Sequence, residues 1–284
     1  MALLDVSHLR IEFPTRRGLL TAVDDVSFSI DEGEVLGVVG ESGAGKSLTG
    51  MSIIGLLEPP GRIAGGEIRF EGRRIDNLPY EELRRIRGKQ IGAIFQDPLT
   101  SLTPLYSIGE QLIETIQTHT DLSNAAARKR AIEMLGEVGI PSPQSRIDNY
   151  PHQFSGGMRQ RVVIALALCV NPRLVIADEP TTALDVSIQA QIIALLKRLC
   201  RDHGTAVMLV THDMGVIAET ADRVAVPNPI NPPPGCAFHP RCPHAFDRCR
   251  VERPDLMATG GASVASCWLY DRQPASAPGA TGAP

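Results

Sequence analysis

The sequence predicts an α/β protein built around a mostly parallel sheet with helices on both faces. Short apolar strands alternate with helical segments along most of the 284 residues, an order typical of parallel sheets. Several of these strands are apolar at every position, as strands buried on both faces are. A glycine-rich loop joins one such strand to a helix, the place where sheets of this class bind phosphate groups.

The N-terminal part begins with strand-like runs separated by turns. We expect strands over residues 3–13, 21–30 and 35–39. A helix over 46–57 follows, and the Pro-Pro-Gly sequence at 59–61 would end it.

Farther along, the same reasoning predicts further strands over 67–70, 90–95, 174–177 and 206–210. Two helices are expected within 107–139, and the helical spacing of apolar residues predicts another over 186–201. The alternation of strand and helix therefore continues to about residue 210.

Composition excludes several classes of protein. The formal net charge is −4, which does not support a basic surface for nucleic acid. The longest apolar run, 162–170, is far shorter than the ~20 residues of a membrane span. The first residues lack the basic and apolar regions of a signal peptide. We expect a cytoplasmic protein that reaches a membrane only through a partner.

The amino-acid composition of the chain changes after Val226, where prolines become frequent. Residues 1–226 form the expected α/β domain, and the proline-rich stretch 227–235 is suited to neither helix nor central strand. We interpret 227–235 as a linker, 236–270 as a small cysteine-rich module, and 271–284 as a disordered tail.

A phosphate-binding loop is the clearest chemical signal. It fits the pattern G-x-x-x-x-G-K-S and consists of Gly40, Glu41, Ser42, Gly43, Ala44, Gly45, Lys46 and Ser47. The loop follows an apolar strand and opens a predicted helix, which is the context that the pattern requires. Lys46 is expected to hold the β- and γ-phosphates and Ser47 to bind Mg²⁺.

Two carboxylates end the buried strand 174–177. Parallel strands present their ligands at their carboxyl ends, so Asp178 and Glu179 should lie near the phosphate loop. Asp178 suits Mg²⁺, and Glu179 suits the general base that polarises the attacking water.

Residues 154–161 (FSGGMRQR) resemble the signature sequence of the ATP-binding-cassette (ABC) ATPases, and they precede the Asp178–Glu179 strand as in that family. Gln96 resembles the family's Q-loop, residues 182–185 its D-loop, and His212 its switch histidine. Phe13 lies where an aromatic ring often stacks on adenine. The resemblance covers residues 1 to about 226.

This resemblance implies the fold of P-loop NTPases of the ABC type, with an antiparallel β subdomain and a helical signature subdomain at about 97–170. It also implies a head-to-tail pair of cassettes, in which each ATP lies between one phosphate loop and the other chain's signature. The implied catalytic residues are Glu179, His212, Lys46 and Gln96, and the implied Mg²⁺ ligands are Ser47, Gln96 and Asp178. The implied nucleotide contacts are Phe13, loop residues 40–47, Ser155, Gly156, Gly157, Gln160 and Asp185.

Residues 95–98 and 100–104, together with the cysteine-rich module, resemble the oligopeptide and dipeptide importer branch. That branch implies an ATPase subunit at the cytoplasmic face of the cell membrane, bound to two permease subunits and to a sister ATPase or itself. An extracytoplasmic substrate-binding protein would take part indirectly. Nickel import, or a truncated ATP-binding regulator that supports no transport, are the alternatives.

Four cysteines, Cys236, Cys242, Cys249 and Cys267, are separated by five, six and seventeen residues. In a cytoplasmic protein such a cluster favours metal over disulfides. Spacing alone favours zinc, the family resemblance shifts the prediction to a [4Fe–4S] cluster, and no metal at all stays open. Cys169 and Cys200 are interpreted as small buried hydrophobes.

The chain departs from the family after the switch histidine. Family members continue there through a strand, a helix and a connecting segment, whereas residues 222–226 pass directly into the proline-rich linker. Several tens of residues are thus missing, and we expect lower stability because a sheet edge and its cover are lost.

Overall fold

The computed structural model describes residues 2–16, 18–40, 43–181, 184–225, 235–236, 238–239, 242, 244–260 and 263–271. The chain divides into two compact units, Met1–Ile230 and Asn231–Pro284, which we call the nucleotide unit and the C-terminal unit. The predicted tail after residue 271 and the predicted linker before Gly235 lie outside the described residues.

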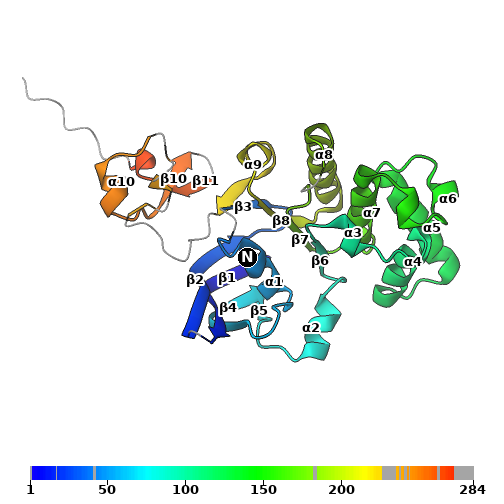
Figure 1. The fold of residues 1–284 in the computed structure, drawn as a ribbon, viewed down its shortest axis with the longest axis horizontal. Coiled ribbons are helices and arrows are strands. Elements are labelled where there is room, and N and C mark those ends of the chain that lie inside the picture. Colours follow the sequence, from blue (N-terminus) through cyan, green and yellow to red (C-terminus); the bar gives the residue numbers. More distant parts are fainter. Residues whose placement is uncertain are drawn as a thin grey trace, which may run out of the picture. The chain divides into compact units, whose positions relative to one another are not determined.

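The nucleotide unit contains two sheets (Figure 1). The antiparallel sheet has the order β2-β1-β4-β5, with strands β1 (Leu4–Thr15), β2 (Gly18–Ile30), β4 (Arg62–Phe70) and β5 (Arg73–Arg74). The parallel sheet has the order β6-β7-β8-β3-β9, with strands β6 (Ile91–Ile94), β7 (Leu174–Asp178), β8 (Ala206–Thr211), β3 (Val35–Val39) and β9 (Arg223–Ala225). These sheets confirm the predicted fold.

Helices surround the parallel sheet, and α4 to α7 gather in a separate group beside it (Figure 1). The helices of this unit are α1 (Lys46–Ile53), α2 (Tyr80–Ile86), α3 (Pro98–Ser101), α4 (Ile108–His119), α5 (Asn124–Glu137), α6 (Pro143–Arg146), α7 (Gly156–Leu168), α8 (Val186–His203) and α9 (Met214–Thr220), with a 3-10 turn η1 (Pro151–Gln153).

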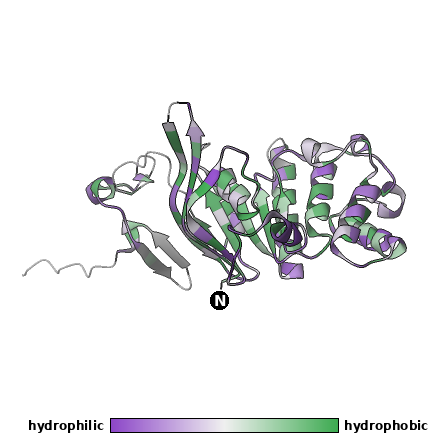
Figure 2. Cartoon of the chain, turned by 90° about the horizontal axis from the view of Figure 1, so that it is seen from below, coloured by the Kyte–Doolittle hydropathy of each residue, from purple (hydrophilic) through white to green (hydrophobic). Residues whose placement is uncertain are grey.

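The core lies on both faces of the parallel sheet because alternate residues of each strand point to opposite sides. In β3, Val35 and Val39 join the cluster that includes the helices α4, α7 and α8. Leu36 and Val38 join the cluster formed with α1 and the antiparallel sheet. Figure 2 shows hydrophobic residues concentrated in these central strands. The apolar strands predicted from the sequence are therefore strands buried on both faces.

One predicted helix is too long. The helix predicted over 46–57 ends at Ile53, and Gly55 follows with a φ of 60°, a left-handed conformation typical of residues just after a helix. The signature helix α7 begins at Gly156 with Ser155 as its N-cap. The short helices α2 and α9 were not predicted from the sequence.

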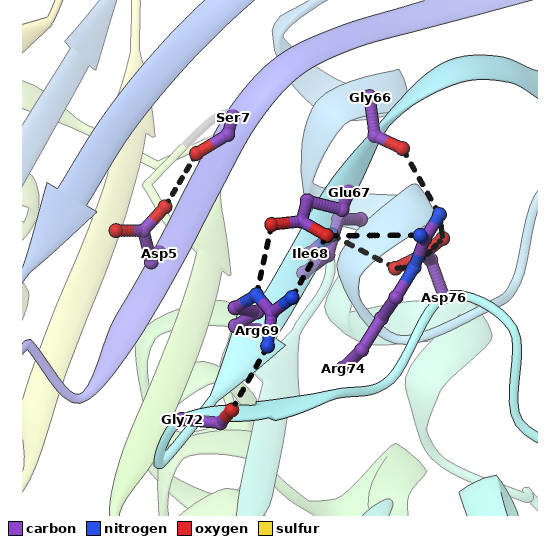
Figure 3. A network of polar contacts seen from close by, with 9 residues as sticks. All are labelled: Asp5, Ser7, Gly66, Glu67, Ile68, Arg69, Gly72, Arg74 and Asp76. Atoms are coloured by element: carbon purple, nitrogen blue, oxygen red, sulfur yellow. Dashed lines mark hydrogen bonds and ion pairs between the residues drawn. The ribbon is translucent and has the colours of Figure 1, made fainter.

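A polar network holds the outer edge of the antiparallel sheet (Figure 3). Arg74 lies 2.8 Å from Asp76 and 3.6 Å from Glu67, and the N–H of Ile68 donates to Asp76 at 2.9 Å. Burial opposes the charge of Asp76, but the hydrogen bonds from Arg74 and Ile68 outweigh it, so the pKa of Asp76 is lowered. This carboxylate is therefore stabilised in its charged form.

Cys169 and Cys200 are buried in the nucleotide unit. Burial raises the pKa of both thiols to about 12. They are therefore small buried hydrophobes, as predicted, and are inert as nucleophiles at neutral pH.

The C-terminal unit has little regular structure. It contains α10 (Asp247–Val251), the antiparallel pair β10 (Leu256–Gly260) and β11 (Ser263–Ser266), and the 3-10 turn η3 (Trp268–Tyr270). Among the residues of this unit whose burial is described, Cys249 and Pro254 are buried.

Candidate active site

The loop between β3 and α1 has a backbone that glycine adopts without strain. Gly43 and Gly45 have φ angles of 83° and 77°, in the left-handed region. A Cβ at Gly45 would also lie 2.7 Å from Val23 Cγ2 and 2.8 Å from the Ala22 carbonyl oxygen. Gly45 is the N-cap of α1, so the loop wraps the end of a helix whose free N–H groups attract anions.

Lys46 and Ser47 follow this loop as the first residues of α1. Lys46 is only 5% exposed, and its Nζ donates to the carbonyl oxygen of Gly40 at 2.9 Å. Ser47 Oγ donates to Asp178 Oδ1 at 2.9 Å. The residues predicted to hold phosphate and Mg²⁺ therefore lie together, except that residues 41–42 are outside the described part.

The carboxyl end of β7 brings Asp178 and Glu179 to this loop. Burial raises the pKa of Asp178, the hydrogen bond from Ser47 lowers it, and the charge of Glu179 raises it again. Glu179 has a φ of 46°, a left-handed conformation that is strained for glutamate. Its N–H still donates to Val210 of β8 at 2.8 Å. The strand thus leads to two carboxylates in unfavourable settings: Asp178 has a raised pKa and Glu179 has a strained backbone.

Two side chains from other elements contact the Glu179 carboxylate. Gln96 Nε2 donates to Glu179 Oε2 at 2.9 Å, and His212 Nδ1 lies 3.2 Å from Oε1. Glu179 has a side chain 18% exposed, whereas that of His212 is 65% exposed. Gln96 follows β6 and His212 follows β8, so three neighbouring strands deliver one cluster at their carboxyl ends.

A pocket of about 630 Å³ opens over this cluster. Its lining residues are Gly43, Ala44, Gly45, Lys46, Ser47, Leu48, Gln96, Glu179 and His212. One side of the pocket thus offers a helix N-terminus and a lysine, and the other a carboxylate with two polar neighbours. This arrangement can bind a polyphosphate and place a base next to it. Leu48 is the one lining residue absent from the sequence prediction.

The signature residues occupy a different surface. Ser155 is exposed and caps α7, with its Oγ accepting from the N–H of Met158 at 3.4 Å. Gly156 is also exposed and Gly157 is half-buried. No signature residue lines the described pocket. The N-terminus of α7 is therefore exposed and lies outside the lining of this pocket.

The predicted D-loop precedes α8. Asp185 is exposed at the N-cap of this helix, and residues 182–183 are outside the described part. Gln189, one turn into the helix, donates to the carbonyl oxygens of Thr181 and Leu184 at 3.2 and 3.0 Å. The sequence analysis missed Gln189; its spacing of four residues from Asp185 is the signal that could have identified it.

Two predicted nucleotide contacts lie elsewhere. Phe13 is on β1, partly buried against the core, and its ring would meet a Cβ at Gly61 within 2.6 Å. Gln160 is only 1% exposed, and neither residue lines the described pocket. Their predicted contact with nucleotide therefore stays a prediction without geometric support.

The four clustered cysteines are free thiols in the C-terminal unit. Backbone hydrogen bonds connect three of them: the Cys236 N–H donates to the Cys249 carbonyl at 2.8 Å, and the Cys242 N–H donates to the carbonyl of His239 at 3.3 Å. Among the described residues, however, no three side chains of His, Cys, Asp or Glu gather as metal ligands do. The described residues therefore give no geometric support to the predicted iron–sulfur cluster or to zinc.

A group of polar contacts around Arg248 connects separate segments of this unit. Its guanidinium carbon lies 3.5 Å from the centre of the Trp268 ring. The same group contacts Glu252 at 2.7 Å and Asp271 at 2.6 Å, and Trp268 Nε1 donates to the carbonyl oxygen of Glu252 at 3.0 Å. We call these four residues the Arg248 clasp.

Fold and site together define a P-loop nucleotide hydrolase. The sequence profile of the ABC transporter family matches residues 23–182, more than half of the chain. The chain belongs to this family. It is accordingly an ATPase that uses ATP and Mg²⁺, and the loop, Lys46, Ser47 and Asp178 fit that pair of ligands.

Curated relatives resemble nearly the whole chain. The dipeptide transport ATP-binding protein DppD of Escherichia coli (strain K12) is 40% identical, covering 94% of this chain and 96% of its own length. The oligopeptide transport ATP-binding protein OppD of Salmonella typhimurium is 43% identical, with 94% and 93% covered. The OppD of Bacillus subtilis is 53% identical over 225 residues, which are 79% of this chain and 63% of that protein.

Solved structures agree with the fold. A dimeric post-hydrolysis state of the ATP-binding cassette MJ0796, bound to ADP and Pi, has a TM-score of 0.70 and 31% identity. The match covers 79% of this chain and 94% of that one. CbiO1 from Clostridium perfringens, part of the transporter complex CbiONQ, has a TM-score of 0.67 and 28% identity, covering 80% and 84%.

The alignments also bear on the missing segment. With DppD, 94% of the 284 residues, about 267, are spread over 315 positions, so about 48 positions lack a residue in this chain. The alignment with the Bacillus subtilis OppD has no such excess, since 79% of the chain is about 224 residues and the alignment has 225 positions. The excess agrees in size with the segment predicted to be absent after Val226.

Among the described residues, no helix is both long enough and apolar enough to cross a lipid bilayer.

Proposed function

We propose that this chain is the ATP-hydrolysing subunit of an ABC importer for dipeptides or oligopeptides. The observation that carries the proposal is the Glu179 cluster, in which one carboxylate beside the phosphate loop is held by Gln96 and His212. The assignment of peptides as the cargo is supported by the relatives named above, which are dipeptide and oligopeptide transport proteins.

Each loop residue has a proposed role in binding. The backbone of residues 40–47 cradles the phosphates, and Lys46 turns from Gly40 to the β- and γ-phosphates. Ser47, Asp178 and Gln96 hold the metal. When bound, Mg²⁺ neutralises charge that develops on the phosphate oxygens.

Glu179 is the proposed general base. Its side chain borders the pocket, and its two polar neighbours fix the direction of the carboxylate. It accepts the proton of the attacking water, which raises the water's nucleophilicity at the γ-phosphate. His212 orients that water, and its exposed ring can reach the γ-phosphate.

We also propose that the working site is shared between two cassettes. Ser155 and Gly156 are exposed at a helix N-terminus that the chain's own pocket leaves unused. In a head-to-tail pair this second anion site faces the phosphates bound by the partner, and closure traps ATP between the two chains. Asp185, exposed at the start of α8, would join the same interface.

The proposed assembly includes two membrane permeases and either a sister ATPase or a second copy of this chain. The chain would sit peripherally on the cytoplasmic face of the membrane, and an extracytoplasmic binding protein would supply the cargo. Its boundaries follow the sequence analysis: an ATP-binding domain at 1–226, with a helical part at about 97–170, a linker at 227–235 and the cysteine module at 236–270.

Two functional alternatives from the sequence analysis are kept. A nickel importer would use the same ATPase chemistry with different permeases. A truncated regulator, suggested by the roughly 48 alignment positions of DppD that lack a residue here, would bind ATP without permeases. Co-purification separates an importer subunit from a regulator, because only the importer subunit is recovered with permeases.

The predicted [4Fe–4S] cluster at Cys236, Cys242, Cys249 and Cys267 is kept as a proposal, with zinc as the alternative. It is supported by the clustering of cysteines and the resemblance alone. Iron and zinc analysis of protein purified without air decides it: iron with broad visible absorption supports the cluster, and zinc without iron reverses the order.

Mixed dimers test the shared site. We expect Lys46→Ala and Ser155→Phe each to abolish ATP turnover when alone. Mixing them should restore about a quarter of wild-type turnover, since half of the dimers are mixed and each has one intact site. Full turnover by Ser155→Phe alone, or by a chain that stays monomeric, would refute the proposal. If the chain pairs only with a sister ATPase, the same substitutions are divided between the two proteins.

A further inference from the structure

Gln160 has an unusual environment. It lies in α7, is 1% exposed, and within the described residues its Nε2 is a buried nitrogen with no hydrogen-bond partner. Buried polar groups in native proteins are nearly always paired, so an unpaired amide calls for a functional reason. Leaving a donor unpaired also destabilises the fold.

The way α7 packs against β6 indicates that the Gln160 amide lies near the Q-loop, the segment that contains Gln96. A Cβ on Gly92 of β6 would lie 2.7 Å from the carbonyl oxygen of Ala167, so the C-terminal end of α7 meets the beginning of β6. The helix leads by a short connection into β7, which is parallel to β6, so α7 runs antiparallel to both strands.

Gln160 lies seven residues before Ala167, which is two turns of helix, on the same face and about 10 Å away. A distance of about 10 Å in the direction of β6 corresponds to about three residues of extended chain. Counted from Gly92, it reaches Phe95 and Gln96, just beyond the end of the strand. Helical side chains also lean toward the N-terminus of their helix. The Gln160 amide therefore lies at the level where β6 ends and the Q-loop begins.

The same helix begins at the signature residue Ser155. Gln160 thus stands between the anion site at the start of α7 and Gln96, which contacts Glu179. A side chain in this place can couple the position of Gln96 to the position of the N-terminus of α7, because a rigid helix transmits movement from one end to the other.

We propose that Gln160 is a positioning residue for the Q-loop. The Q-loop has two arrangements: the one described here, in which the amide is unpaired, and a second in which Gln160 Nε2 donates to a main-chain carbonyl of residues 95–98. ATP favours the second arrangement, and the hydrogen bond gained there stabilises it. This inference rests on the proposed role of Gln96 at the nucleotide.

Gln160→Met tests the proposal because methionine has a similar length and no donor. The orphan amide is removed, so we expect Tm to rise by about 2–4 °C. We also expect kcat to fall about tenfold with KM for ATP unchanged, because the Q-loop is no longer held in its second arrangement. A side chain with a purely structural role would not raise stability while lowering turnover.

Leu168→Met is the matched control. Leu168 is fully buried in the same helix but at the end away from the Q-loop. This volume-conserving change should leave turnover as in the wild type and lower Tm slightly.

Hydrogen exchange gives a readout that does not need turnover. ATP should slow amide exchange over residues 95–104 in the wild type, and Gln160→Met should lose most of that protection. The inference is wrong if Gln160→Met lowers Tm together with kcat, or if kcat and the exchange response stay as in the wild type. Absent turnover in the wild-type complex would instead refute the proposed function, while the exchange response still decides the role of Gln160.

Discussion

The two units of this chain are stabilised in different ways. In the nucleotide unit, a parallel sheet has buried clusters on both faces, and its strands end in the functional side chains. In the C-terminal unit, where the structure describes side-chain burial, Cys249 and Pro254 are buried, and the Arg248 clasp joins residues far apart in the sequence. A large unit can therefore tolerate strained or unpaired groups at its site, while a small unit depends on a few specific contacts.

The largest expected effect lies in the chemistry of the nucleotide unit. Glu179→Gln keeps the shape of the side chain but removes the base, so ATP turnover should fall about 10²- to 10⁴-fold. ATP binding, measured with a fluorescent analogue, should persist. The fluorescence of Trp268 should not change, because that residue belongs to the other unit. Near-normal hydrolysis by this variant would contradict the assignment.

The next effect concerns the core. Leu112 of α4 is fully buried in the cluster around the helical group. Leu112→Ala should lower the free energy of unfolding by about 3–5 kcal/mol, through lost burial and a cavity. Urea unfolding followed by circular dichroism measures it.

The matched change in the C-terminal unit is Leu269→Ala. Leu269 is 56% exposed, so the expected change is within about 0.5 kcal/mol. Equal losses from the two substitutions would contradict the difference in burial between Leu112 and Leu269.

A smaller effect tests the Arg248 clasp. Trp268 is the chain's one tryptophan, so its fluorescence reports on the C-terminal unit alone. Arg248→Ala should shift this emission to longer wavelength, because the ring loses its stacked cation and becomes more exposed to water. The urea unfolding of the nucleotide unit should not move.

Arg250→Ala is the control for the clasp, since Arg250 lies in the same short helix and is exposed. An unchanged spectrum for Arg248→Ala would show that something else holds the unit. Restoration of the wild-type spectrum by adding iron or zinc to that variant would point to a metal.

Small shifts in Tm are expected at two carboxylates whose pKa values are shifted in opposite directions. Burial raises the pKa of Asp178 above its unfolded value, so its charge opposes folding at neutral pH. This cost falls as the pH drops through the raised pKa. Asp178→Asn should therefore raise Tm by about 1–3 °C at pH 7, less at acidic pH, while abolishing Mg²⁺-dependent turnover.

Asp76 should behave in the opposite way. Its pKa is lowered in the folded chain, so its charge stabilises the fold above the unfolded pKa and the contribution is lost as the pH falls through the folded value. Asp76→Asn should lower Tm at pH 7 and have less effect in acid. Thermal scans from about pH 2 to pH 8 compare the two variants, because the contribution of Asp76 is lost only below its unfolded pKa of 3.8. A loss of stability at pH 7 from Asp178→Asn would contradict the assigned cost.

Local chemistry fixed much of this molecule at the level of the sequence. The all-apolar strand 35–39 and the glycine loop predicted β3 and the start of α1, because strand burial and left-handed glycines depend on nearby residues. The order of motifs likewise identified the family, since ABC motifs are read along the chain and need no coordinates.

Tertiary packing decided what sequence patterns could not contain. The helix predicted over 46–57 ends at Ile53, and the left-handed Gly55 that follows is packed closely against Leu83 of α2, a contact that the local sequence pattern does not contain. Gln160 was predicted to contact nucleotide from its place in the signature, and its burial, 1% exposed, is a feature that the motif does not contain. Spacing along a chain predicts which residue types occur together, but contacts between strands and helices far apart in sequence determine where each side chain points. The convergence of Gln96 and His212 on Glu179 is such a contact: it exists only because three parallel strands end at one edge.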